Sequence, residues 1–442
     1  MKVTVIGCTH AGTAAIANLA KHHPKAELTV YERNDNISFL SCGIALYLEG
    51  VVKDPSGLFY SSPEDLASLG VNVKMRHNVT GIDFEGKKVK AKNIATGEEV
   101  FGSWDKLIIT TGSWPILPRF SGADLGNVLL CKNYDHAKSI IAKAENSSNV
   151  AIIGAGYIGV ELAEAFSANG KNTTLIDMSP RIMSKYMDAE FTAPAEDALA
   201  SHGVKLALGE SVVEIKGQGG SASSVVTNNG EYPAELVIVC IGFKPTSDLF
   251  RGKINTLPNG AIIVDEYMRS SLPDVFAAGD CASIFYNPTG ENDYIPLATN
   301  AIRMGALAAI NLLEPKIKYL GTQATSGIKI YDLNLAATGL TEEAAKQLGM
   351  PVNSVTVKDS YVPEFMPEFT EATLKLVYNS RNRVLLGAQL LSRADYTQTI
   401  NTLAVCLQNK MTIEQIAFVD QFFQPNFNKP WNLMNTAALA AL

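Results

Sequence analysis

Cys42 is the residue whose setting is best suited to redox chemistry. It lies in SFLSCGIALYLEG (residues 38–50), directly before a helical pattern over residues 44–48. A helix N-terminus favours the thiolate, which is the reactive form of cysteine, so we expect the pKa of this thiol to be lowered. Tyr47 stands five residues further on, which leaves Cys42 without a partner for a local disulfide. A single thiol can instead cycle between thiolate and sulfenic acid.

The other cysteines show neither CxxC nor zinc-site spacing, so the sequence predicts no metal site. A disulfide framework is not expected in a chain of this length without a sign of secretion. A small buried thiol is the ordinary role of cysteine, and we expect it for most of these residues. They are Cys8, Cys131, Cys240, Cys281 and Cys406.

A complete glycine motif lies between a predicted strand and a predicted helix in the middle of the chain. GAGYIG (residues 154–159) opens a βαβ pattern whose second strand ends at Asp177. Gly154 permits the tight turn, Gly156 lets a pyrophosphate approach the backbone, and Gly159 lets helix and strand pack closely. The phosphates would lie at the helix N-terminus, where free N–H groups favour negative charge. The unit therefore predicts a dinucleotide site.

The same unit occurs at the N-terminus in a weaker form. KVTVIG (residues 2–7) is a β-branched strand that ends at Gly7, and the following helix begins near Gly12. Thr9 replaces the middle glycine, so a purely structural turn is the alternative. Glu32 closes the second strand, as Asp177 does in the other copy, and favours a second dinucleotide site.

Two further segments place strand ends beside a presumed cofactor. SLPDVFAAGD (residues 271–280) is an apolar run that ends in Gly279 and Asp280, and its carboxylate suits the hydroxyls of a ribityl chain. LIITTG (residues 107–112) ends a strand at a glycine in the same way. An ordinary strand and turn is the alternative interpretation of the segment at residues 271–280.

The bulk numbers limit the class of protein. At 442 residues the chain is long enough for about three domains. A net charge of −7 argues against nucleic-acid or anionic-membrane partners, because both require a basic surface. No apolar stretch is long enough to span a bilayer, and the N-terminus lacks the pattern of a signal peptide. We therefore expect a cytoplasmic protein.

LIITTGSWP, GAGYIG and DVFAAGD, in this order, resemble the flavin-dependent pyridine nucleotide–disulfide oxidoreductases. The resemblance covers essentially the whole chain and implies an α/β fold. It implies a discontinuous FAD-binding domain at residues 1–112 and 243–320, with a Rossmann-like NADH-binding domain at 113–242 inserted between the halves. Residues 321–442 would form an α+β dimerisation domain.

The segments SFLSCGIALYLEG and GCTHAG closely resemble the single-cysteine NADH oxidase and NADH peroxidase group. The resemblance implies that His10 accompanies Cys42 as the second catalytic residue and hydrogen-bonds the reacting oxygen. It places Arg303 near the same site and makes Tyr157 a gate over the flavin. It also brings the aromatic C-terminal residues close to the partner's active site in a homodimer or homotetramer.

The remaining cofactor-binding residues that we expect from these motifs and the resemblance surround the two βαβ units. Asp177 favours NADH by repelling a 2′-phosphate, although Arg181, four residues on, would weaken this selectivity. The full set is Gly7, Thr9, His10, Ala11, Gly12, Glu32, Arg33, Ser41, Cys42, Thr111, Gly112, Lys132, Gly154, Gly156, Tyr157, Ile158, Gly159, Glu161, Asp177, Gly242, Gly279, Asp280, Leu297, Ala298 and Thr299.

The expected activity is that of a water-forming NADH oxidase. NADH would reduce FAD, oxygen would be reduced to peroxide, and Cys42 would reduce the peroxide to water. NADH peroxidase, with H2O2 as substrate in place of O2, is the close alternative, and coenzyme A disulfide reductase is a third. An NADH-binding flavin redox sensor without turnover is the alternative from another class. The intact nucleotide motif together with Cys42 argues against the sensor.

Overall fold

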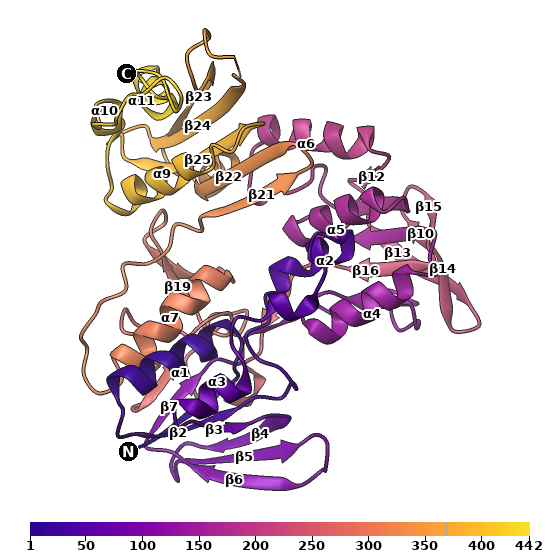
Figure 1. Cartoon of the computed structure of the whole chain (residues 1–442), viewed down its shortest axis with the longest axis vertical. Helices are drawn as coiled ribbons and strands as arrows, with labels where there is room; N and C mark the ends of the chain where they lie inside the picture. The colour runs from indigo at the N-terminus through magenta and orange to yellow at the C-terminus, as the bar shows by residue number, and fades with distance from the viewer. Residues whose placement is uncertain (368) are drawn as a thin grey trace.

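The computed structural model describes residues 1–367 and 369–442, which fold around separate β-sheets (Figure 1). Within these residues, no helix combines the length and apolarity needed to cross a membrane, and no group of His, Cys, Asp and Glu side chains is arranged to hold a metal. The fold class is the α/β architecture expected from the sequence.

The first sheet is parallel and has the strand order β18-β7-β1-β2-β3. Its strands are short, and four of them are apolar and mostly buried, as expected of a parallel sheet covered on both faces, whereas the edge strand of residues 72–74 is partly exposed. They are β1 (Lys2–Ile6), β2 (Glu27–Tyr31), β3 (Asn72–Lys74), β7 (Lys106–Ile109) and β18 (Val275–Ala277). The last strand joins from a distant part of the chain.

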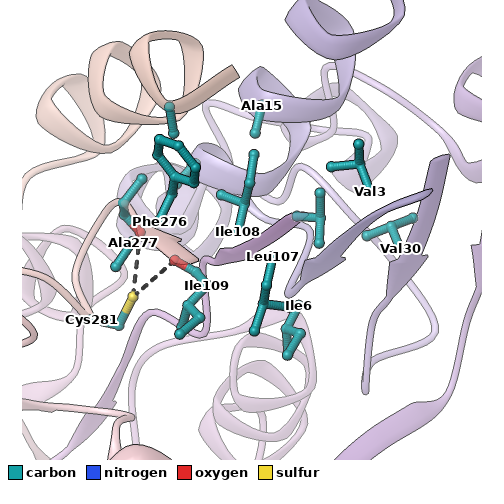
Figure 2. Packing of buried hydrophobic residues seen from close by; sticks show 14 of the residues in the cluster. Val3, Ile6, Ala15, Val30, Leu107, Ile108, Ile109, Phe276, Ala277 and Cys281 are labelled. Atoms are coloured by element: carbon teal, nitrogen blue, oxygen red, sulfur yellow. Dashed lines mark hydrogen bonds between the residues drawn. The ribbon is translucent and has the colours of Figure 1, made fainter. Parts of the chain in front are cut away.

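Helices, a three-stranded antiparallel sheet and a two-stranded sheet belong to the same part of the fold. They are α1 (His10–His22), η1 (Ser41–Gly43), α2 (Ile44–Glu49), η2 (Pro55–Leu58), α3 (Pro63–Ser68), β4 (His77–Asp83), β5 (Lys88–Asn93), β6 (Glu99–Ser103), η3 (Asp248–Phe250), β19 (Ile284–Tyr286), β20 (Glu291–Asp293) and α7 (Ala298–Ile310). Of these elements, α2 and η2 pack against the middle sheet. Figure 2 shows Ile108 of β7 packed beside Ala15 of α1 and Phe276 of β18.

The middle sheet is also parallel and has the strand order β12-β11-β10-β16-β9. Its elements are β9 (Val128–Leu130), α4 (Tyr134–Ala144), β10 (Asn149–Ile153), α5 (Tyr157–Ala168), β11 (Asn172–Asp177), α6 (Ala189–Ser201), β12 (Lys205–Leu208) and β16 (Leu236–Val239). An antiparallel sheet of β13 (Val212–Gln218), β14 (Ser221–Thr227) and β15 (Glu231–Pro233) packs against it.

Two short strands carry the chain between these sheets. The strand β8 (Ser113–Pro115) follows β7, and β17 (Phe243–Pro245) follows β16. They pair antiparallel, with Lys244 opposite Trp114. The outward and the return connections therefore run side by side and fix the first two sheets to each other.

The C-terminal sheet is antiparallel and has the strand order β21-β22-β25-β24-β23. Its elements are β21 (Ser326–Ile330), β22 (Leu333–Gly339), α8 (Glu342–Gln347), β23 (Val352–Ser360), β24 (Glu371–Asn379), β25 (Leu385–Ser392), α9 (Gln398–Gln408), α10 (Ile413–Ala417) and α11 (Leu433–Leu439). In Figure 1 this sheet lies beside α6 at the top of the molecule.

Candidate active site

The two βαβ units use one carboxylate each to hold their glycine loops. Glu32 accepts hydrogen bonds from the backbone N–H groups of Cys8 (2.6 Å) and Asn34 (2.8 Å). Asp177 accepts from the corresponding N–H groups of Ala155 (2.6 Å) and Ser179 (2.7 Å). In each unit the carboxylate thus binds the residue after the first glycine and the residue two positions beyond itself.

Close backbone contact explains the outer glycines of both motifs. A Cβ atom on Gly159 would overlap the carbonyl oxygen of Gly154, and one on Gly12 would overlap that of Gly7. Helices α5 and α1 therefore start against the strands that precede them, which only glycine permits. At Gly156 a Cβ would meet only a Tyr186 ring carbon at 3.9 Å, which leaves that side open for a phosphate.

A cavity runs along the carboxyl ends of the first sheet, where ligands bind in open parallel sheets. The start of α1 lies at it, with free N–H groups suited to a pyrophosphate. The expected residues that line it are Gly7, Thr9, His10, Ala11, Glu32, Arg33, Ser41, Thr111, Gly112, Lys132, Gly279 and Asp280. The first βαβ unit and the later GD segment therefore meet in one place, and the donor set fits FAD.

Asp280 belongs to a polar cluster inside this cavity. Its carboxylate accepts hydrogen bonds from Ser113 Oγ (2.8 Å) and Lys132 Nζ (3.3 Å), and Lys132 also donates to Ser113 (3.0 Å). The ammonium lies 4.5 Å from the ring centre of Phe243. Ser113 is part of the SWP segment, but nothing in the sequence indicated its contact with Asp280, which lies far along the chain.

Cys42 lies on the accessible surface between the cavity and the middle sheet. Ser41 lines the cavity, whereas Ile44 and Leu58 are buried in the core of the middle sheet. Cys42 is the exposed member of the cysteine set, and all six thiols are free. Cys8, Cys131, Cys281 and Cys406 are buried, as expected for core residues.

The expected lowering of the Cys42 pKa is wrong. Although Cys42 is exposed, the surrounding protein removes part of the solvation of its thiolate, and this raises the pKa of Cys42. The Glu161 carboxylate raises it further, while Lys132 lowers it. The thiol lies in a single 3-10 turn, and α2 behind it has only six residues, so few aligned peptide dipoles oppose this loss of solvation. Loss of solvation is therefore the main cause of the raised pKa of Cys42, and the charged side chains of Glu161 and Lys132 adjust it.

We predict that Glu161→Gln lowers the pKa of Cys42. Burial raises the pKa of Glu161 to about 7, so its carboxylate is charged mainly above that pH. Removing this charge stabilises the thiolate, so alkylation of Cys42 by iodoacetamide becomes faster, by about threefold. The difference from wild type grows as the pH rises through 7, and Cys42→Ser supplies the background rate. Superimposable alkylation profiles would show that Glu161 does not act on Cys42.

His10 lies at the first turn of α1 and is held by Tyr60. Its Nδ1 is 3.0 Å from the Tyr60 hydroxyl, and the two rings are stacked with centres 5.8 Å apart. Burial lowers the pKa of His10, which keeps the imidazole neutral at pH 7. Asp280 and Lys132 act on both His10 and Cys42, so these two residues share one electrostatic environment. Sequence reasoning missed Tyr60, because no motif contains it.

Tyr157 does not line the cavity. Its hydroxyl lies 2.9 Å from Ser326 Oγ of the C-terminal sheet, and its ring lies 4.4 Å from that of Tyr186. A gating movement of this side chain would break the contact with Ser326. The gate over the flavin therefore stays a prediction.

The other expected site residues lie outside the lining of the first cavity, on α5, on α7 and in the return connection. Ile158, Gly159 and Glu161 belong to α5, and Gly242 lies at the start of the return connection. Leu297, Ala298 and Thr299 form the start of α7. Arg303 hydrogen-bonds Asn300 and lines a second cavity between α7 and α9, together with Thr299.

Comparison with known proteins places this architecture in a family. Residues 1–305 match the sequence model of the pyridine nucleotide-disulphide oxidoreductases, and residues 325–434 match the dimerisation domain of the same family. The chain belongs to the pyridine nucleotide-disulphide oxidoreductase family. The resemblance inferred from the motifs is confirmed.

Similar members of the family match over the full chain. An NADH oxidase from Enterococcus faecalis is 52% identical over 443 residues, covering 100% of this chain and 99% of that protein. The solved structure of a water-forming NADH oxidase from Lactobacillus brevis bound to NADH is 52% identical, with a TM-score of 0.98 over 100% of this chain and 98% of that one. An engineered water-forming NADPH oxidase bound to NADPH matches with the same values, and its five substitutions include one of aspartate by alanine.

Proposed function

We propose that this chain is an FAD-dependent NADH oxidase that reduces O2 to water through a Cys42 thiol and sulfenic acid centre. The observation that carries the proposal is the accessible single thiol between the FAD-type cavity and the glutamate of the nucleotide helix α5. The similarity to NADH oxidases over the full chain supports the same activity.

The cavity residues indicate how the chain would hold FAD. Glu32, at the end of β2, would face the adenosine ribose, the start of α1 the pyrophosphate, and Asp280 the ribityl hydroxyls. NADH would bind at the GAGYIG loop and Asp177. Bound FAD supplies hydride acceptance from NADH and electron transfer to oxygen.

Cys42 would reduce the peroxide that forms first. Its sulfur attacks one peroxide oxygen, the O–O bond breaks, and the second oxygen leaves as water, which leaves sulfenic acid at Cys42. A second NADH supplies the two electrons that restore the thiol and release the second water. With Nδ1 held by Tyr60, Nε2 is the ring nitrogen of His10 that remains to hydrogen-bond the oxygen on Cys42.

The ratio of NADH to oxygen consumed tests this function. Purified protein in air should consume about two NADH per O2 and release little hydrogen peroxide, because four electrons are required per O2. Slow oxygen use with rapid use of added peroxide would identify a peroxidase. Rapid reduction of coenzyme A disulfide would identify the third candidate activity.

We further propose the domain division expected from the sequence, with residues 1–112 and 243–320 binding FAD and residues 113–242 binding NADH. Residues 321–442 would form the dimer interface. The match of 325–434 to a dimerisation domain supports self-association, and exposed aromatic residues between Phe418 and Trp431 suit a protein contact. Light scattering should give the mass of a homodimer, and a doubled value would indicate a tetramer.

Asp177→Ala is expected to narrow the preference for NADH over NADPH. In the wild type the Asp177 carboxylate accepts from the ribose hydroxyl and repels a 2′-phosphate, which corresponds to about tenfold selectivity or more. The ratio of the two kcat/KM values measures the effect. Asp177→Asn should narrow it as well, since it removes the charge and keeps a hydrogen-bonding side chain. Asp197→Ala, on the exposed face of α6, serves as the control. Unchanged selectivity in both Asp177 variants would show that another residue discriminates.

A further inference from the structure

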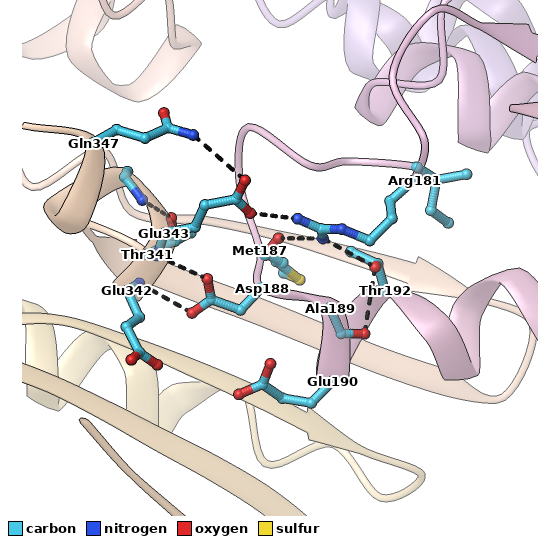
Figure 3. Close-up of polar contacts among 12 residues, drawn as sticks. Arg181, Met187, Asp188, Ala189, Glu190, Thr192, Thr341, Glu342, Glu343 and Gln347 are labelled. Atoms are coloured by element: carbon cyan, nitrogen blue, oxygen red, sulfur yellow. Dashed lines mark hydrogen bonds and ion pairs between the residues drawn. The ribbon is translucent and has the colours of Figure 1, made fainter. Parts of the chain in front are cut away.

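Arg181 does not stand beside Asp177 as a second recognition group. Its guanidinium donates to the Met187 carbonyl (3.2 Å) and the Thr192 hydroxyl (3.3 Å), and to the carboxylate of Glu343 at 2.6 Å. Glu343 belongs to α8 of the C-terminal region. Figure 3 shows the guanidinium between Glu343 and Thr192. The expectation that Arg181 weakens the selectivity of Asp177 is not supported by this arrangement.

The backbone of Arg181 nevertheless lies close to the nucleotide loop. Ala155, within GAGYIG, donates its N–H to Asp177 (2.6 Å) and accepts at its carbonyl from the N–H of Met183 (2.8 Å). Asp177 and Met183 therefore flank the same residue of the glycine loop, and Arg181 lies between them in sequence. A long side chain from this position has the reach to approach a phosphate on the ribose.

The backbone at Glu343 is itself held in place by the neighbouring domain. Asp188, at the end of the same loop, accepts from the backbone N–H groups of Glu342 (3.0 Å) and Glu343 (3.2 Å) at the start of α8. Asp188 also pairs with the buried Lys375 at 3.0 Å and with Gln389. The loop and α8 therefore hold each other in register, and Glu343 stays opposite Arg181.

We propose that Glu343 is a specificity-determining residue: it binds the Arg181 guanidinium and so keeps a cation from the 2′ position of the bound nucleotide. Arg181 is 20% exposed in this contact, whereas Glu343 is 52% exposed and has room to be replaced without repacking. Loss of the carboxylate leaves the guanidinium with only its two longer contacts, to Met187 (3.2 Å) and Thr192 (3.3 Å), and so makes it available to a phosphate, which arginine binds well. The inference rests on the proposed use of NADH and adds a selectivity element from outside the NADH-binding domain.

The test is the ratio of the dissociation constants of NADP+ and NAD+, measured by calorimetry on the FAD-loaded protein. Glu343→Gln should lower this ratio by about threefold to tenfold, mainly through tighter NADP+ binding, the range expected for one partly exposed charge-assisted contact. Arg181→Gln and the double variant Glu343→Gln/Arg181→Gln should both keep the wild-type ratio. The double variant also lacks the Glu343 carboxylate, so the loop is loosened as in Glu343→Gln, but it has no cation at residue 181. A wild-type ratio in the double variant therefore shows that the cation causes the change.

A matched control is available in the same domain. Arg383 and Glu414 form an ion pair of the same length, 2.6 Å, with comparable exposure, far from the nucleotide loop. Glu414→Gln should leave the ratio unchanged. An unchanged ratio in Glu343→Gln, or a lowered ratio that persists in the double variant, would overturn the proposal. Because binding is measured without turnover, failure of the wild type to bind NAD+ would instead refute the proposed function.

Discussion

Cys42→Ser is expected to change the product from water to hydrogen peroxide. Cys42 is not among the residues that line the cavity, so serine should leave the FAD site and NADH consumption nearly intact. The serine hydroxyl stays protonated near neutral pH and does not attack peroxide, whereas cysteine is a strong nucleophile even with a small thiolate fraction. The variant should use about one NADH per O2 instead of two.

The measurement pairs oxygen uptake with a peroxide assay in wild type and variant. Cys131→Ser is an unsuitable control because that residue is buried. Leu46→Ala, at an exposed position of α2 outside the cavity lining, serves as the control for local disturbance. If Cys42→Ser still makes water without detectable peroxide, Cys42 is structural and the mechanism is wrong.

Because the pKa of Cys42 is raised, peroxide reduction in the wild type should accelerate as the pH rises above 7.

Of the substitutions proposed for this protein, Lys375→Met is expected to lower the free energy of unfolding most. The Lys375 ammonium is 5% exposed and pairs with Asp188 (3.0 Å), Glu190 (2.6 Å) and Glu342 (2.8 Å). Burial opposes the charge of Lys375, but the three carboxylates together raise its pKa above the usual value. Methionine leaves Asp188, 7% exposed, without its cation, which costs about 3–5 kcal/mol.

Thermal unfolding and hydrogen exchange measure this effect. A loss of about 3–5 kcal/mol in the free energy of unfolding lowers the Tm of the C-terminal domain by on the order of 10 °C. Faster exchange should appear at α8 and at the start of α6, since Asp188 joins them. Lys346→Met is the matched control, because Lys346 also pairs with Glu342 but is 62% exposed, and its loss should cost about 0.5 kcal/mol or less. Equal shifts in both variants would contradict the assigned role of Lys375.

Local patterns were sufficient to predict both nucleotide-binding units. Strand β1 (Lys2–Ile6) lies within the β-branched run of residues 2–7, β11 (Asn172–Asp177) ends at the expected aspartate, and the glycines lie where helix and strand touch. These features depend on residues within about thirty positions of each other, so the spacing of apolar residues and glycines is enough to predict them. The family match confirms the membership inferred from the motifs, which are local patterns of the same kind.

Contacts between segments that are distant in sequence could not be predicted from the sequence pattern. The acidity of Cys42 depends on Glu161, Lys132 and burial rather than on the helix that follows it, so the sign of its pKa shift was wrong. Tyr60 and Ser113 acquire their roles only through the fold. Arg181 is only four residues from Asp177 in sequence, yet its charge is paired with Glu343 of another domain.

The position of β18 in the first sheet has a consequence for the order of folding during synthesis. Strand β7 gains its outer neighbour only when Val275–Ala277 has left the ribosome, after the whole middle sheet has been made. At about 5–20 residues per second, the ribosome needs on the order of ten seconds or more for this interval. Asp280 emerges directly after β18. We therefore expect the middle sheet to fold first on the nascent chain and FAD to be captured later, when the flavin site becomes complete.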